Sequence, residues 1–226
     1  VNALFNKSYH VDSPLSCAFR IKDKKIRKMI LEKNPNLNIS WKGNTYMHNA
    51  AQTKSLPFLN FLISKKLNIN VLNNKKVSPL EVAIVNRHAK IAKKLLQQGA
   101  KTKTHRKDKV TLLHFACHKG MFDVVKLLLK KGASLKAKEG YGRTALHYAA
   151  ASYNPPLVRF LIRKGLKVSV KDRFKRLPLH YACISYNLPI SKIFLSKGSN
   201  INARDYLKST PLHYAAKGYS QKLVKY

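Results

Sequence analysis

The chain has 226 residues, of which 45% are hydrophobic, and this is enough apolar material for a folded protein with a real core. It holds 45 Lys and Arg against 9 Asp and Glu, and the resulting net charge of +36 favours negatively charged partners. So few carboxylates leave little material for paired-carboxylate catalysis, and no run of about 18 apolar residues occurs that could form a membrane helix.

Three cysteines, Cys17, Cys117 and Cys183, lie far apart in the chain. They form no CxxC pair, and their odd number does not suit a disulfide framework, so the pattern is typical of a reducing compartment. We therefore expect an intracellular protein of the cytoplasm or nucleus, or one that acts inside a host cell if it is a secreted effector.

One short pattern returns along the chain with a constant period of about 33 residues. A weaker copy begins near Ser13, and the following copies begin at Thr45, Ser78, Thr111, Thr144, Leu177 and Thr210. A glycine marks the same period at a fixed distance after four of these starts, at Gly99, Gly132, Gly165 and Gly198. Two independent markers with one period indicate a repeat protein.

Each copy is predicted to form two helices followed by a turn. A Ser or Thr caps the first helix in most copies, and a proline often occupies its first turn, where a missing N–H costs nothing. The second helix is clearest over 122–131, and it ends at Gly132, where we expect the left-handed conformation of a helix C-terminus. The residues that follow, such as 134–143, carry turn chemistry and are expected to project as a hairpin, called a finger below.

These features make the chain similar to the ankyrin repeat family. The family's T-P-L-H-x-A-A core occurs at 210–216 and its L-L-x-x-G-A helix end at 128–133. The resemblance covers about residues 13–226 and implies an all-α repeat solenoid, in which ankyrin-type helix-turn-helix units with β-hairpin fingers stack on one another. We take 1–226 as a single ankyrin-repeat domain of about seven copies, with the last one truncated, residues 1–12 as the tail of a preceding repeat, and further sequence beyond one or both ends.

The N-terminal third departs most from the family pattern. Glu81 stands where the family's histidine is expected, and Lys66 and Asn34 replace the glycine that ends the second helix. Asn adopts the left-handed conformation readily, whereas Lys does so at a cost.

Five histidines share one repeat position, and we assign them a structural role. Successive copies are about 10 Å apart, the thickness of a packed helix, so no metal with bonds near ~2 Å can join them. Each imidazole is expected to bond to the neighbouring Thr and to loop backbone, and the four repeat glycines are expected to be structural as well. The histidines are His48, His114, His147, His180 and His213.

No feature predicts an enzyme, a cofactor, a metal or a small-molecule substrate. No GxSxG, Walker, GxGxxG or HExxH motif occurs. His114 and His118 lie four residues apart on one predicted helix, as in some zinc sites, but no nearby carboxylate supplies a third ligand. Cys117 and Cys183 occupy a position where the family has Ala, and we interpret them as small buried thiols.

The resemblance implies that a partner binds to the finger tips and to the exposed part of the first helices. Four lysines stand at a turn position where the family normally has Gly, and aromatic residues lie among the basic ones, which is typical of binding hot spots. The predicted partner-binding residues are Lys75, Lys76, His105, Lys107, Lys109, His118, Lys119, Lys138, Tyr141, Arg143, Lys171, Arg173, Phe174, Lys175, Arg176, Arg204, Tyr206, Lys208 and Lys217.

Three functional hypotheses follow. The first is a non-enzymatic, monomeric interaction scaffold that binds an acidic protein surface through its concave face and fingers. The second is direct binding to a polyanion, either a nucleic acid backbone or an anionic, phosphoinositide-rich membrane, and it depends on the net charge alone. The third is a targeting module of a larger effector, whose catalytic domain lies outside these residues.

Overall fold

A computed structural model describes most of the chain from residue 40 onward. The described residues are Lys25, Met29, Ser40, Trp41, 43–104, 106–217, Val224 and Lys225. The expectations for residues 1–12, the copy near Ser13, Cys17, Asn34 and His105 lie outside them. The chain divides into two compact units, 1–101 and 102–226, and each is described by itself. That all repeats form one domain stays a prediction.

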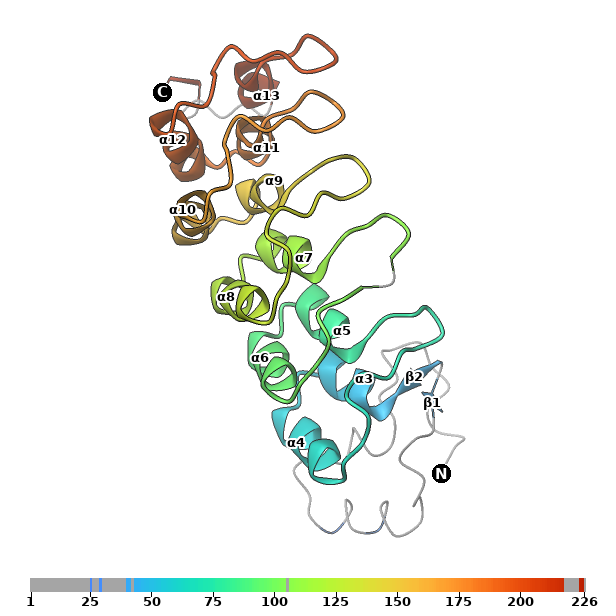
Figure 1. Ribbon diagram of the computed structural model, residues 1–226. Helices are drawn as coiled ribbons and strands as arrows, with labels where there is room; N and C mark the ends of the chain where they lie inside the picture. The colour runs from blue at the N-terminus through green and yellow to red at the C-terminus, as the bar shows by residue number, and fades with distance from the viewer. Residues whose placement is uncertain are drawn as a thin grey trace. The chain divides into compact units, whose positions relative to one another are not determined.

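The first unit contains two repeats of paired helices (Figure 1). A short antiparallel pair of strands, β1 (Ser40–Trp41) and β2 (Asn44–Thr45), precedes them. The inner helices α3 (Tyr46–Gln52) and α5 (Pro79–Val85) pack side by side. The outer helices follow them, as α4 (Leu56–Ser64) and α6 (Ala89–Gln97).

The second unit repeats this plan, and its inner helices lie side by side with fingers that project from one edge (Figure 1). The inner helices are α7 (Leu112–His118), α9 (Ala145–Ala150), α11 (Pro178–Ile184) and α13 (Pro211–Lys217). The outer helices are α8 (Phe122–Lys130), α10 (Pro155–Arg163) and α12 (Leu188–Ser196). No described helix is long and apolar enough to span a bilayer.

Capping residues set where the helices begin. The Ser78 hydroxyl accepts a hydrogen bond from the Glu81 N–H at 3.2 Å, and the side chains of Asn154 and Asn187 cap α10 and α12 in the same way. Leu177 has no hydroxyl to offer, so α11 relies on Pro178 in its first turn.

Packing between repeats supplies most of the stability, because isolated helices of seven to nine residues are unstable in water. The inner helices bury alanines, such as Ala116, Ala149 and Ala182, and these small side chains let neighbouring backbones approach closely. The outer helices bury larger residues, such as Leu128 and Phe194. The predicted all-α repeat architecture is confirmed.

The fingers differ from the expected β-hairpins. Within the described residues only β1 and β2 pair as strands, whereas the later fingers close through turn hydrogen bonds. In finger 172–176, for example, the Asp172 N–H donates to the Arg176 carbonyl at 3.0 Å and the Lys175 N–H donates back to Asp172 at 3.0 Å.

Left-handed backbone recurs three times in a repeat. It occurs at the end of the outer helix, where φ is +84° at Gly132 and +55° at Lys66. It occurs near the finger tip, at Lys175 with φ +59°, and in the turn between the two helices, at Tyr153 with φ +53°. Glycine adopts this conformation without strain, and other residues adopt it at a cost of about 1–2 kcal/mol.

Candidate functional site

An acidic or amide side chain closes the base of most fingers. In finger 139–143, Glu139 Oε1 accepts from the N–H groups of Tyr141 and Arg143 at 3.0 and 3.1 Å. The Asp172, Asp205 and Asn73 side chains accept from two backbone N–H groups in the same way, at positions related by the repeat. The three acids are buried, so the base of each finger is part of the scaffold.

Finger 106–110 breaks this rule, because Arg106 occupies the position of the acid. Its partner Asp108 lies two residues later, and the Arg106 guanidinium donates to it at 2.8 Å. This hydrogen bond is the main reason why the pKa of Asp108 lies below its usual range. Both side chains are about 40% exposed, so the pair contributes little to stability.

Backbone hydrogen bonds hold neighbouring fingers at a constant spacing. The Gly140 N–H donates to the Asp108 carbonyl at 2.7 Å, Arg173 donates to Tyr141 at 2.8 Å, and Tyr206 donates to Phe174 at 2.9 Å. In the first unit, the Asn74 N–H donates to the Gly43 carbonyl at 3.3 Å. Side chains at equivalent finger positions are therefore brought side by side, although a whole repeat separates them in the sequence.

Two of the predicted partner-binding arginines are used inside the chain. Arg176 Nε donates to Asp205 at 3.0 Å and its Nη2 donates to the Tyr214 hydroxyl at 2.7 Å, so it ties finger 172–176 to finger 205–209. Burial alone would raise the pKa of Asp205, but the hydrogen bonds that its carboxylate accepts from Tyr214 and Arg176 outweigh burial and hold the pKa below its usual range.

Arg143 is held in the same manner, with Nε 3.0 Å from Glu139 and its guanidinium over the rings of Tyr141 and Tyr148. Burial opposes ionisation of Glu139, but the bonds from Arg143 lower its pKa overall. We therefore assign Arg143 and Arg176 to the scaffold, which differs from the expectation that they face a partner.

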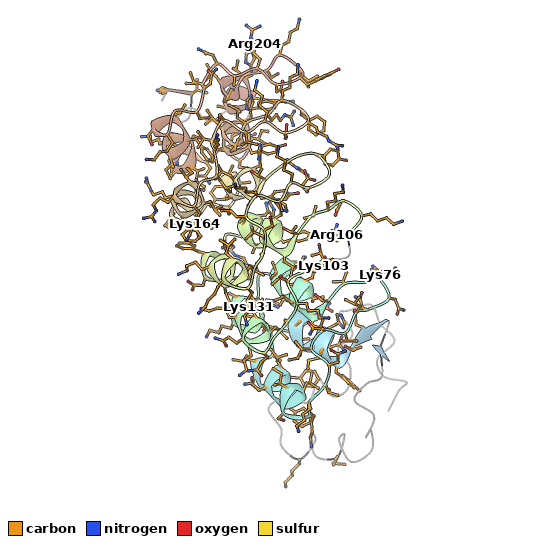
Figure 2. The ribbon with its side chains drawn as sticks, in the orientation of Figure 1. Lys76, Lys103, Arg106, Lys131, Lys164 and Arg204 are labelled. Atoms are coloured by element: carbon orange, nitrogen blue, oxygen red, sulfur yellow. The ribbon has the colours of Figure 1, made fainter. Side chains whose placement is uncertain are left out.

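The other basic finger residues are exposed. Within residues 106–217, no ion pair engages Lys138, Lys171, Arg173, Lys175, Arg204 or Lys208. Figure 2 shows Lys76, Arg106 and Arg204 on fingers, whereas Lys131 and Lys164 lie at the ends of outer helices. The exposed basic finger residues are Lys75, Lys76, Lys107, Lys109, Lys138, Lys171, Arg173, Lys175, Arg204 and Lys208.

Aromatic side chains continue from finger to finger among these cations. The rings of Tyr141 and Phe174 stack, with centroids 5.6 Å apart, and the Lys175 ammonium lies 5.9 Å from the centre of the Tyr206 ring. Tyr206 is 72% exposed, so its ring is accessible to a binding partner. Rigid rings beside cations form a surface that can bind both apolar and anionic groups.

Two of the repeated histidines, His48 and His147, join an inner helix to the next finger. In His147, Nδ1 accepts from the Thr144 N–H at 3.1 Å, and Nε2 donates to the Arg176 carbonyl at 3.2 Å. His48 bonds to Thr45 and to the Val77 carbonyl in the same way. Burial disfavours the imidazolium and lowers the pKa of His147 to about 4, so the ring is neutral.

The remaining histidines of this row keep the helix-cap contact. The N–H groups of Thr111, Leu177 and Thr210 donate to Nδ1 of His114, His180 and His213, at 3.0 to 3.2 Å. Burial lowers the pKa of His114 and His180 as well. Nε2 of His114 and of His180 is buried without a hydrogen-bond partner, so the expected bond to loop backbone is absent at these two residues.

Comparison with protein-family models decides the family of the chain. The model for ankyrin repeats matches three times, over residues 15–106, 80–172 and 150–226. The chain belongs to the ankyrin repeat family. A comparison with curated proteins finds no match. Ankyrin repeats generally mediate protein–protein interaction, so the coarse function of the chain is that of an interaction module.

The predicted residues on the ankyrin inner helices lie apart from the finger tips. His118 is exposed at the end of α7, and its ring meets the edge of Tyr148 with centroids 6.3 Å apart. Lys119 follows it, and Lys217 is exposed at the end of α13. Among the described residues no cluster of His, Cys, Asp or Glu could hold a metal ion.

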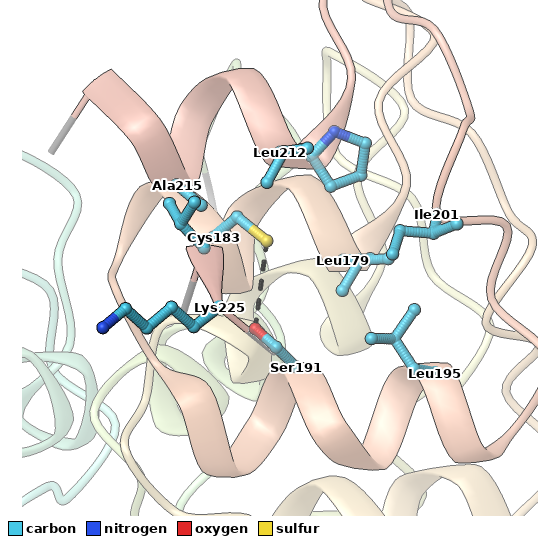
Figure 3. Close-up of a pocket in the computed structure, with 10 residues that line it drawn as sticks. Leu179, Cys183, Ser191, Leu195, Ile201, Leu212, Ala215 and Lys225 are labelled. Atoms are coloured by element: carbon cyan, nitrogen blue, oxygen red, sulfur yellow. Dashed lines mark hydrogen bonds between the residues drawn. The ribbon is translucent and has the colours of Figure 1, made fainter. Parts of the chain in front are cut away.

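An apolar pocket of about 300 Å³ lies at the last ankyrin repeat that the structure describes (Figure 3). Leu179, Cys183 and Leu212 line it, and the Cys183 sulfur lies 3.9 Å from the Ser191 hydroxyl. Burial raises the pKa of the Cys183 thiol to about 11, so the thiol is protonated and unreactive at neutral pH. Cys117 is fully buried, and burial raises its pKa as well.

A polar groove of about 660 Å³ lies between ankyrin fingers 172–176 and 205–209. Sequence reasoning found its basic residues but missed three of its polar, uncharged residues, Ser169, Asn200 and Asn202. Ser169 and Asn202 occupy equivalent positions in successive repeats, as do Lys171 and Arg204. This shared repeat position could have revealed the polar residues from the sequence, because side chains at equivalent positions of adjacent fingers line the same groove.

Proposed function

We propose that this ankyrin module binds an acidic surface of a protein partner through its fingers and has no catalytic activity of its own. The exposed basic finger residues contact the partner's carboxylates, and Tyr141, Phe174 and Tyr206 supply rigid contact area. We place this activity inside a cell, in keeping with the free, buried thiols of Cys117 and Cys183.

The observation that carries the proposal is the lysine at the left-handed finger position. Lys76, Lys109, Lys175 and Lys208 have φ of +56° to +60°, whereas Gly43 and Gly142 take the same position without strain. Strained backbone of this kind is concentrated at functional sites. All four lysines are exposed, so packing of their side chains does not offset the backbone strain. The strain is consistent with selection for positive charge at this position.

A pull-down from lysate tests the proposal when a finger variant and a matched control are compared. The finger variant reverses Lys171, Arg173 and Lys175 to Glu, and the control reverses Lys130, Arg159 and Arg163 on the outer helices. Both variants change the net charge equally, and all six side chains are exposed. A partner that the control retains and the finger variant loses supports the proposal, and equal losses would contradict this placement.

Salt and nuclease treatment distinguish the second candidate, which the net charge of +36 favours. A protein partner bound through charge and aromatic contacts is weakened by salt but survives nuclease. If nuclease abolishes capture of the partner, and if binding falls steeply as salt rises, the basic surface would instead be assigned to a nucleic acid backbone. Flotation with anionic liposomes tests the membrane form of the same alternative.

A further inference from the structure

We propose that the groove between fingers 172–176 and 205–209 binds a compact ligand with two or more phosphate groups, either free or as a lipid headgroup. The groove belongs to the second unit alone, so every contact used below lies within residues 169–214. The proposal goes beyond the protein partner proposed above, because it assigns a small ligand to one groove within the basic finger surface.

Four cations define the groove. Lys171 and Lys175 reach it from one finger, and Arg204 and Lys208 reach it from the next. All four are exposed, and no ion pair engages them within residues 106–217. Like charges brought together in this way repel one another unless an anion neutralises them.

One carboxylate faces the same groove, but it is already neutralised. Asp205 is 4% exposed, and its carboxylate accepts from Arg176 at 3.0 Å, from Tyr214 at 2.6 Å and from two backbone N–H groups. These four donors occupy the carboxylate oxygens of Asp205, so Asp205 does not pair with the four cations of the groove. The groove therefore keeps an excess of positive charge.

The number of charges and the volume select the ligand. Two phosphate monoesters carry about −3 to −4 at neutral pH, which matches four cations. A volume of about 660 Å³ exceeds what a single phosphate fills and falls within the range of small-ligand sites. Ser169, Asn200 and Asn202 add neutral hydrogen-bonding groups on the wall, which suit the hydroxyls of a sugar or inositol ring.

Two of the left-handed lysines lie at the same groove. Lys175 and Lys208 both line the groove, and both occupy the finger position at which Gly142 stands in the preceding finger. The two fingers that enclose the groove thus both carry the strained cation. The Tyr206 ring forms part of the wall, with its centre 5.9 Å from the Lys175 ammonium.

Calorimetric titration with inositol trisphosphate at physiological salt tests the site directly. We expect one ligand for each chain, and about tenfold weaker binding in each of the variants Lys175→Gly and Lys208→Gly, because each removes a charge-assisted hydrogen bond. The double variant should bind about a hundredfold more weakly. Glycine is the natural residue of this turn, so the variants remain folded.

The matched control is the double variant Lys76→Gly, Lys109→Gly. It makes the same substitution at the same repeat position and changes the net charge equally, but neither residue lines the groove. Its affinity for inositol trisphosphate should stay within about twofold of the parent chain, since long-range charge is screened at this salt. Equal losses in both double variants, or no binding by the parent chain, would overturn the proposal.

Two further arms identify the source of the phosphate. The first arm is flotation with vesicles that contain phosphatidylinositol bisphosphate. If the parent chain floats and the double variant Lys175→Gly, Lys208→Gly does not, the groove binds a lipid headgroup. If the parent chain binds free inositol trisphosphate but does not float, the groove binds a soluble ligand. A glutamate-rich peptide that competes with equal affinity would overturn the phosphate proposal. The titration needs no protein partner, so its failure and failure of the partner pull-down are distinguishable.

Discussion

The base and the tip of a finger follow opposite rules, although they are only a few residues apart. At the base, Glu139, Asp172 and Asp205 are buried and have all their main partners inside the chain. At the tip, Lys175 and Lys208 are exposed, strained and without an ion-pair partner within residues 106–217. The base is built for stability, and the tip retains a destabilising residue that stability alone would replace.

The largest effect is expected at the base. Asp205→Ala leaves the Arg176 guanidinium, the Tyr214 hydroxyl and two backbone N–H groups without their acceptor. We expect the free energy of unfolding to fall by about 3 kcal/mol, as for other buried ion pairs that lose one member. Urea denaturation measures this.

The control for this experiment is Asp123→Ala. Asp123 pairs with Lys126 at 3.0 Å, but both side chains are at least half exposed, so the loss should be about 0.5 kcal/mol or less. Similar losses in the two variants would show that the finger base is not a special source of stability.

The second effect is a dependence of stability on pH that arises beside the finger base. The pKa of His147 is about 4 in the folded chain, below the value of about 6.5 in an unfolded one, so the unfolded chain binds more protons between these values. Stability is complete above pH 6.5 and falls as the pH drops toward 4. From pH 7 to pH 5, His147 alone should remove about 2 kcal/mol.

Chemical denaturation at both pH values checks this effect in His147→Gln. The variant is expected to be less stable at pH 7, but its loss on going to pH 5 should be about 2 kcal/mol smaller than that of the parent chain. An unchanged loss would mean that another group, such as His114 or His180, carries the pH dependence.

A smaller effect is expected when a lysine is placed at the tip of a finger that has glycine there. Gly142→Lys places a side chain at φ +77°, where its Cβ meets only ordinary contacts with Arg173 and Asp172 at 3.6–3.8 Å. The cost is therefore conformational, and the free energy of unfolding should fall by about 1 kcal/mol. A gain in thermal stability would contradict the assigned strain.

The smallest effect is the reverse exchange, Lys175→Gly. Relief of strain is partly offset by the greater freedom of glycine in the unfolded chain, so we expect the variant to be more stable by about 0.5 kcal/mol. Thermal melting measures this gain, and binding assays should show a loss in the same variant. A residue that lowers stability and raises affinity is functional, whereas a variant that loses both would place Lys175 in the scaffold.

The repeat plan was predictable from the sequence because its signals are local and periodic. Thr or Ser at the start of an inner helix, Pro in its first turn and Gly132 at the end of an outer helix each act within a few residues. The left-handed position of Lys175 followed from the same register, because Gly142 stands at that position one repeat earlier.

Only the tertiary structure decided how the finger side chains are used. Arg176 and Lys175 are adjacent in the sequence and alike in charge, yet Asp205 and Tyr214, brought close by stacking of the next repeat, bind one and leave the other exposed. Tyr153 lies in the left-handed turn between α9 and α10, and its hydroxyl donates to the carbonyl of Ser185, a residue of the next repeat. Contacts between residues of different repeats leave no local signal, because they depend on which repeat faces which.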